Sequence, residues 1–153
     1  EWPVIEGSPD LTGDLDIQLR ARQTSASGEK AYALLFRAED DNHLYRFGVS
    51  ANSREYSQGK FWGTADSPQY TTLVAWAVSS AISEGTATNV LRVICEGAQI
   101  KLYVNGIYLT AVNDNSYPSG KVGMDAVSFS NSSGVDARFD DLTVYRAGQR
   151  PAE

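Results

Sequence analysis

Residues 89–112 read NVLRVICEGAQIKLYVNGIYLTAV, and this stretch carries two tight turns separated by one short apolar segment. Asn105 and Gly106 suit a two-residue type I′ turn, because both residue types tolerate positive φ. Gly97, followed by Ala98, suits a type II′ turn, which favours glycine at its first central position. The stretch therefore predicts three consecutive antiparallel strands.

The two turns also determine which residues pair across the strands, and the two registers agree. One register places Leu102 opposite Leu109, and the other places Leu102 opposite Val93. The face expected to be buried is apolar throughout: Leu91, Val93, Cys95, Ile100, Leu102, Val104, Ile107, Leu109 and Ala111. The opposite face is largely polar or aromatic: Arg92, Lys101, Tyr103, Tyr108 and Thr110, with Ile94 as the apolar exception. A sheet with one apolar face needs a second layer to cover it.

The rest of the chain also alternates between apolar and polar residues. Strands are expected at 11–22, 31–37, 43–50, 55–62, 70–78, 121–127 and 135–145. No window has a sustained helical period, and about ten short strands at this spacing are typical of a sandwich or barrel. In the last strand, Phe139 lies on one phase whereas Leu142 and Val144 lie on the other. This change of phase predicts a β-bulge at Asp140 and Asp141.

The composition is that of a globular protein with one core. The chain has 153 residues, of which 42% are apolar and 21% charged, and we expect one β-sandwich domain at 1–148 with a tail at 149–153. The formal charge of −6 argues against a nucleic-acid partner, and no apolar run is long enough for membrane insertion. Because the chain opens at Glu1 without an initiator methionine, we expect it to be part of a larger multidomain chain.

One cysteine and one histidine limit the chemistry that the chain can perform. Cys95 lies on the predicted buried face, where we expect a core thiol rather than a nucleophile. His43 begins a strand beside an acidic turn, where we expect a surface residue rather than a catalytic base. One cysteine and one histidine are too few to supply the four ligands of a typical zinc site.

Six short segments together resemble a known group of proteins: 35–37 (LFR), 41–47 (DNHLYRF), 89–93 (NVLRV), 102–106 (LYVNG), 120–124 (GKVGM) and 139–142 (FDDL). The resemblance is to the concanavalin A-like lectin/glucanase superfamily, and within it to bacterial laminin-G-like and glycosidase-associated domains. It covers residues 11–146 and implies an all-β fold, a jelly-roll sandwich of two antiparallel sheets. Because such domains are commonly appended to secreted or envelope-bound proteins, it also implies an extracellular or cell-envelope location in a bacterium.

Hydrolase members of this superfamily carry a Glu-x-Asp-x-x-Glu or Glu-x-Asp-x-Glu strand, whose carboxylates act together on the glycosidic bond. No such strand occurs here, and the nearest pair, Asp14 and Asp16, lacks a glutamate at the required spacing. This departure favours a non-catalytic domain. An enzyme that uses scattered acids, such as Asp16, Glu39 and Asp125, is the alternative, and it requires two carboxyl groups about 5 to 9.5 Å apart in one groove.

The resemblance further implies a structural calcium ion near the last strand. Asp140 or Asp141, together with backbone carbonyl groups, would supply its oxygen ligands. The alternative is that one of these carboxylates caps the predicted bulge or pairs with Arg138. No other cofactor is expected.

Carbohydrate binding needs an exposed aromatic face and nearby polar groups that bind the sugar hydroxyls. The candidate site residues are three rings and three cationic side chains: Trp62, Tyr70, Trp76, Arg37, Arg46 and Lys60. The alternative is that the rings fill the core. We favour that interpretation for Trp76, whereas the two interpretations are balanced for Trp62, which lies beside a loop.

Taken together, these patterns favour a non-catalytic, lectin-like module that binds a polysaccharide or other glycan within a larger secreted or envelope protein. A structural or adhesion module that binds protein is the first alternative. A glycoside hydrolase-type enzyme is the second.

Overall fold

The computed structural model describes residues 11–26, 28–128 and 137–152. Within these ranges the chain forms ten strands and no helix: β1 (Leu15–Gln23), β2 (Lys30–Asp40), β3 (His43–Ser50), β4 (Glu55–Gly63), β5 (Pro68–Val78), β6 (Asn89–Glu96), β7 (Gln99–Val104), β8 (Ile107–Asn113), β9 (Lys121–Ser128) and β10 (Ala137–Arg146). Consequently, no helix that could cross a membrane is found in this part of the chain. The start of the predicted domain, 1–10, and the start of the last predicted strand lie outside the described residues.

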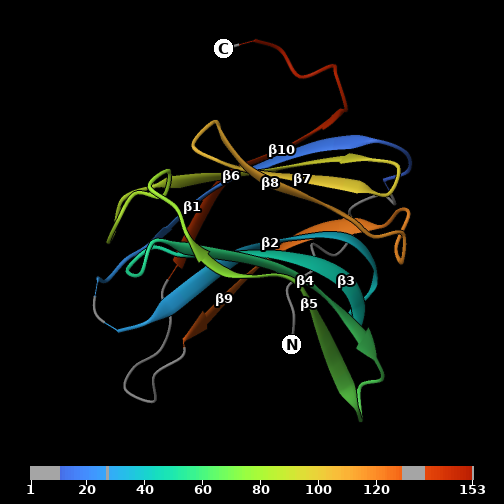
Figure 1. Cartoon of the computed structure of the whole chain (residues 1–153), viewed down its shortest axis with the longest axis horizontal. Coiled ribbons are helices and arrows are strands. Elements are labelled where there is room, and N and C mark those ends of the chain that lie inside the picture. The colour runs from blue at the N-terminus through green and yellow to red at the C-terminus, as the bar shows by residue number, and fades with distance from the viewer. Residues whose placement is uncertain (1–10, 27, 129–136, 153) are drawn as a thin grey trace.

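Two five-stranded antiparallel sheets stack on each other (Figure 1). The upper sheet has the strand order β10-β1-β6-β7-β8, and the lower sheet has the order β5-β4-β3-β2-β9. The lower sheet is arched, since β5 and β9 both bend away from the upper sheet, so its outer face is concave (Figure 1). This two-sheet jelly-roll arrangement confirms the fold class predicted from the sequence.

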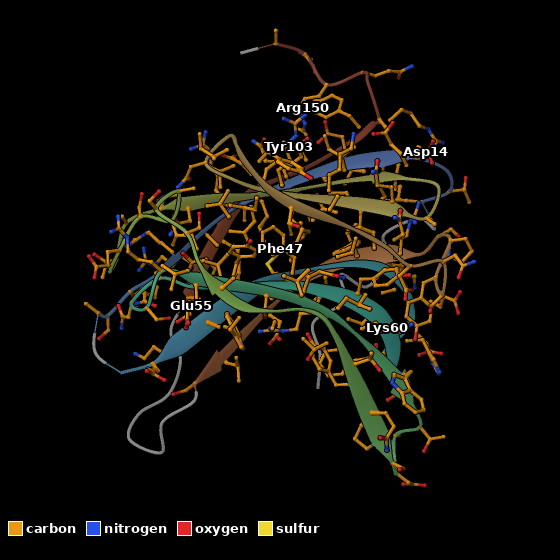
Figure 2. The ribbon with its side chains drawn as sticks, viewed as in Figure 1. Asp14, Phe47, Glu55, Lys60, Tyr103 and Arg150 are labelled. Atoms are coloured by element: carbon orange, nitrogen blue, oxygen red, sulfur yellow. The ribbon has the colours of Figure 1, made fainter. Side chains whose placement is uncertain are left out.

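Side chains that alternate along the strands fill the space between the sheets. The main core cluster includes Ile17 and Leu19 of β1, Leu34 of β2 and Phe47 of β3, and Figure 2 shows Phe47 between the two layers. Cys95 is completely buried in the same cluster, as its phase predicts, and burial raises the pKa of its thiol to about 12. The thiol is therefore a core group.

The two predicted turns are present, but one of the two registers shifts. Asn105 and Gly106 have φ values of 52° and 79°, as a type I′ turn requires, and the β6–β7 pairing is the predicted one. Between β7 and β8, however, Leu102 pairs with Thr110 rather than with Leu109, because a bulge adds one residue to β8. Ala111 therefore faces Lys101 on the outside, and Val112 replaces it against the core.

The bulge predicted in the last strand is present. The β1–β10 pairing shifts between Gln18 and Arg20, opposite Asp140 to Thr143, and Asp141 has a φ of 50°. Phe139 and Val144 both pack against the core, because the extra residue restores the inward phase on each side of the bulge.

The strand β2 is buried on both faces, so it contributes apolar side chains to the core and to the concave face. Phe36 faces the main core, whereas Ala33 and Leu35 face the concave side and form a second apolar cluster with Leu44. The concave face of the lower sheet therefore has a well-packed apolar base.

The last described residues follow β10 without forming a strand, yet Arg150 is anchored to the upper sheet. Its Nε atom lies 3.0 Å from Asp16 Oδ1, its Nη1 atom donates to Thr143 Oγ1 at 2.8 Å, and its guanidinium lies over the Tyr145 ring. Figure 2 shows Arg150 on the outer side of the upper sheet.

Candidate functional site

A hollow of about 490 Å³ opens on the outer face of the lower sheet. Strands β3, β4, β5 and β9 line it with Arg46, Ser57, Phe61, Tyr70, Thr72, Ala75, Trp76, Asp125, Ala126 and Val127. We call this hollow the Arg46 pocket. It combines one cation, one carboxylate and three aromatic rings in a single depression.

Strand alternation places Arg46 in this pocket. Its neighbours Tyr45 and Phe47 point into the core, so the side chain between them must point to the concave face. On that face, the small Ala33 pairs with Gly48 on one side and with Asp125 on the other. The arginine side chain can therefore extend across β2 toward β9.

Two glycines make room for the polar groups of the pocket. A Cβ atom added at Gly48 would lie 2.5 Å from Nη1 of Arg46, which is far too close for ordinary packing. A Cβ atom added at Gly59 would lie 2.3 Å from the hydroxyl oxygen of Tyr70. Any larger residue at either position would displace the side chain that rests on it.

Arg46 and Asp125 form a buried ion pair. Nε of Arg46 donates to Asp125 Oδ2 at 3.2 Å, and the two side chains are only 9% and 8% exposed. Nη2 of Arg46 is also buried, and it has no hydrogen-bond partner among the described residues. A buried donor without a partner costs about 1–3 kcal/mol, so an acceptor atom that reaches it would be bound favourably.

Aromatic rings form the walls of the pocket. The rings of Phe61 and Tyr70 lie 4.7 Å apart between centroids, and Tyr70 and Trp76 are 41% and 40% exposed. Burial of the Tyr70 hydroxyl raises its pKa above the ordinary value, although Arg46 beside it offsets part of this effect. Tyr70 is therefore a neutral phenol at neutral pH and can both donate and accept a hydrogen bond.

A bulge in the lower sheet explains why Trp76 lies in the pocket instead of the core, where the sequence favoured it. Val74 pairs with Gln58 and Ala77 pairs with Tyr56, and both apolar residues pack on the core. Ala75 and Trp76 therefore share the space opposite the single residue Ser57, and all three line the pocket. Strict alternation from Val74 would have turned Trp76 inward.

Arg46, Tyr70 and Trp76 are thus brought together, whereas the other three candidate residues lie elsewhere. Arg37 is 2% exposed, and its Nη1 atom donates to the Gly97 carbonyl oxygen at 2.8 Å. Because Gly97 belongs to the β6–β7 turn, Arg37 spans the gap between the two sheets. Its φ of 46° and a register shift on both sides of β2 turn it away from the concave face.

Lys60 and Trp62 lie on the opposite face of β4 from Phe61, because successive residues alternate. Lys60 Nζ lies 2.8 Å from Asp114 Oδ2 and donates to Ser116 Oγ at 2.6 Å. Trp62 is 45% exposed, and its Nε1 atom donates to Thr71 Oγ1 at 2.9 Å. Neither residue lines the Arg46 pocket.

The sequence suggested Asp125 only as one of three acids for an enzyme, and it did not assign Phe61 or Ser57 to a site. Asp125 is separated from Arg46 by 79 positions, and no local pattern links the two. Of the three acids considered for an enzyme, Asp125 alone lines this pocket, whereas Asp16 pairs with Arg92 on the upper sheet at 2.6 Å. The two-carboxylate groove that a glycoside hydrolase needs is not formed by these three residues.

Asp140 and Asp141, the candidate calcium ligands, lie among cationic side chains. Three arginines share their recess: Arg20, Arg22 and Arg138. Asp141 Oδ2 already lies 3.4 Å from Arg20 Nε, and no cluster of three or more metal-binding side chains is found in the described ranges. A calcium ion would need further oxygen ligands beside these carboxylates, because it favours about six to eight. Calcium binding here stays a prediction, and melting with and without a chelator would check it.

Comparisons with known proteins identify the fold but no sequence family. No family model and no curated protein sequence matches the chain. Among solved structures, the carbohydrate-binding module CBM66 from Bacillus subtilis is 18% identical, with a TM-score of 0.64 over 94% of this chain and 90% of that one. The Caenorhabditis elegans galectin LEC-6 is 11% identical, with a TM-score of 0.57 over 92% of both chains.

A third solved structure is the Bacteroides ovatus mixed linkage glucan GH16 protein in complex with a G4G4G3G product. It is 7% identical, with a TM-score of 0.66 over 92% of this chain and 72% of that one. At these identities the likeness concerns the fold alone. The chain shares its jelly-roll architecture with a carbohydrate-binding module, galectins and a GH16 protein.

Proposed function

We propose that this chain is a non-catalytic carbohydrate-binding module and that the Arg46 pocket is its ligand site. The observation that carries the proposal is the buried Arg46–Asp125 pair, with one unpartnered guanidinium nitrogen, beneath exposed aromatic rings. The solved structures of similar fold, which include a carbohydrate-binding module and galectins, support it.

The chemistry of the pocket matches a neutral sugar. A hydroxyl group that displaces the atoms covering Arg46 Nη2 can accept a hydrogen bond from it and donate one to the Asp125 carboxylate. The Tyr70 and Trp76 rings can pack against the apolar C–H face of a pyranose or furanose ring. Because Asp125 neutralises Arg46, the pocket does not require a charged ligand.

Binding of a panel of immobilised neutral polysaccharides tests the proposal, with a matched pair of tryptophan variants. Trp76→Ala removes a pocket wall and should weaken binding about tenfold, on the order of 1.4 kcal/mol. Trp62→Ala removes a ring of similar exposure outside the pocket and should leave binding unchanged. Failure of the unmodified protein to bind any member, or equal losses in both variants, would overturn the proposal.

We also propose that the chain belongs to a larger protein of the bacterial cell envelope or exterior. The resemblance of its short segments to domains appended to secreted proteins supports this location. Immunodetection of the protein in fractionated source cells would check it, and recovery from the cytoplasmic fraction alone would contradict it.

A further inference from the structure

Trp76 lies between two depressions of the lower sheet. On one side it is a wall of the Arg46 pocket, and on the other it lines a second hollow of about 340 Å³. The second hollow is completed by Glu29, Ser50, Ser53 and Glu55. Since one exposed ring belongs to both hollows, a ligand that stacks on Trp76 can extend into either of them.

The two hollows differ in charge. The carboxylate in the Arg46 pocket is neutralised by its arginine, whereas the second hollow is lined by two glutamates and no cation. In the part of the chain that the structure describes, no ion pair of Glu29 or Glu55 is found. Their oxygens can therefore accept hydrogen bonds from a ligand.

Strand β4 passes along both hollows. Glu55 is the first residue of β4 and pairs with Ser50, whereas Phe61 lies near the other end of the strand. Figure 2 shows Glu55 and Lys60 toward opposite ends of the lower sheet. A chain that fills both hollows would thus run along β4 and β5, from Phe61 past Trp76 to Glu55.

We infer, on the basis of the proposed function, that the ligand is a saccharide chain of at least two units that crosses Trp76. One unit occupies the Arg46 pocket, and the next occupies the hollow lined by Glu29 and Glu55. The second unit presents hydroxyl or protonated amino groups, because donors to a carboxylate form charge-assisted hydrogen bonds. An acidic unit is excluded, because its carboxylate would face two like charges.

Calorimetric titration with gluco-, xylo-, manno-, galacto- and fructo-oligosaccharides of one to four units tests this inference. For the sugar that binds, affinity should rise at least tenfold between one unit and two or three units. Glu55→Gln should lower the affinity for the longer chains severalfold and leave the affinity for one unit unchanged. Asp66→Asn removes a carboxylate in the exposed β4–β5 turn, outside both hollows, and should have no effect.

The outcomes separate the two claims. If an oligosaccharide binds but chain length and Glu55→Gln make no difference, the second subsite is wrong and the proposed function stands. If no member of the series binds, both fail together. Oligogalacturonides of two to four units should not bind, and binding equal to that of the neutral series would overturn the exclusion of acidic units.

Discussion

At the scale of single residues, the hydrogen-bond and ion-pair partners of each charged side chain decide its role. Arg37, Arg46 and Lys60 were all candidates for sugar binding, because each carries donors near aromatic residues. Arg37 donates to a backbone carbonyl of the other sheet, and Lys60 pairs with Asp114. Arg46 alone combines a pocket position with a donor that has no partner among the described residues.

The buried pair of Arg46 and Asp125 should have a large effect on stability. Asp125→Ala leaves a nearly buried guanidinium without its counterion and should lower the free energy of unfolding by about 3 kcal/mol. Replacing both charges, in Arg46→Met with Asp125→Ala, should recover at least about 1 kcal/mol of this loss. Urea unfolding of the two single variants and the double variant measures the coupling, and strictly additive losses would contradict it.

At the scale of secondary structure elements, bulges and glycines shape the binding face. The bulge in β5 presents Trp76 to the concave side, and the bulge in β8 turns Val112 instead of Ala111 toward the core. Each bulge adds one residue to its strand and reverses the phase of the residues beyond it. Gly48 and Gly59 remove side chains where Arg46 and Tyr70 need space.

Two glycine substitutions should separate binding from stability. Gly48→Ala forces Arg46 to move, since the new Cβ would lie 2.5 Å from Nη1, and should lower glycan affinity at least tenfold. Gly106→Ala meets no atom within 4 Å but strains a turn position with a φ of 79°. It should cost about 1 kcal/mol of stability without changing affinity.

Affinity titrations and urea unfolding of both variants check this prediction. Gly48→Ala with unchanged affinity would show that the position of Arg46 does not matter for binding. A loss of affinity in Gly106→Ala would show that the assay reports general destabilisation.

At the scale of the whole molecule, polar side chains join the two sheets at their ends. The Tyr45 hydroxyl of the lower sheet donates to Asp114 Oδ1 at 2.5 Å, and Lys60 lies 2.8 Å from the other oxygen. Asp114 directly follows β8 of the upper sheet. Burial opposes ionisation of this carboxyl, but hydrogen bonds from Lys60, Tyr45 and Ser116 outweigh burial and hold its pKa well below the ordinary 3.8.

This depressed pKa predicts acid sensitivity. The unfolded chain binds the proton more readily than the folded chain, so the contribution of Asp114 to stability is complete above its unfolded pKa of about 3.9. The contribution is lost as the pH falls from that value toward the folded pKa. Asp114→Asn should therefore flatten the fall in unfolding free energy below about pH 4.

Urea unfolding between about pH 2.5 and pH 7 measures this slope. Lys60→Met removes the cation that stabilises the Asp114 carboxylate, so it should also flatten the fall in unfolding free energy at acidic pH. An unchanged slope in Asp114→Asn would place the acid sensitivity in other groups, such as the buried Asp16, whose pKa is also lowered.

The sequence by itself determined the strands, the β6–β7 and β7–β8 turns, the burial of Cys95 and the bulge in β10. These features depend on alternation and turn chemistry, which act over a few residues. The tertiary structure alone decided that Arg46 meets Asp125, that Arg37 turns between the sheets and that Trp76 faces outward. The alternation of apolar and polar residues does not predict these three features. Each depends on contacts with distant strands, and those contacts also select where an inserted residue reverses the phase of a strand.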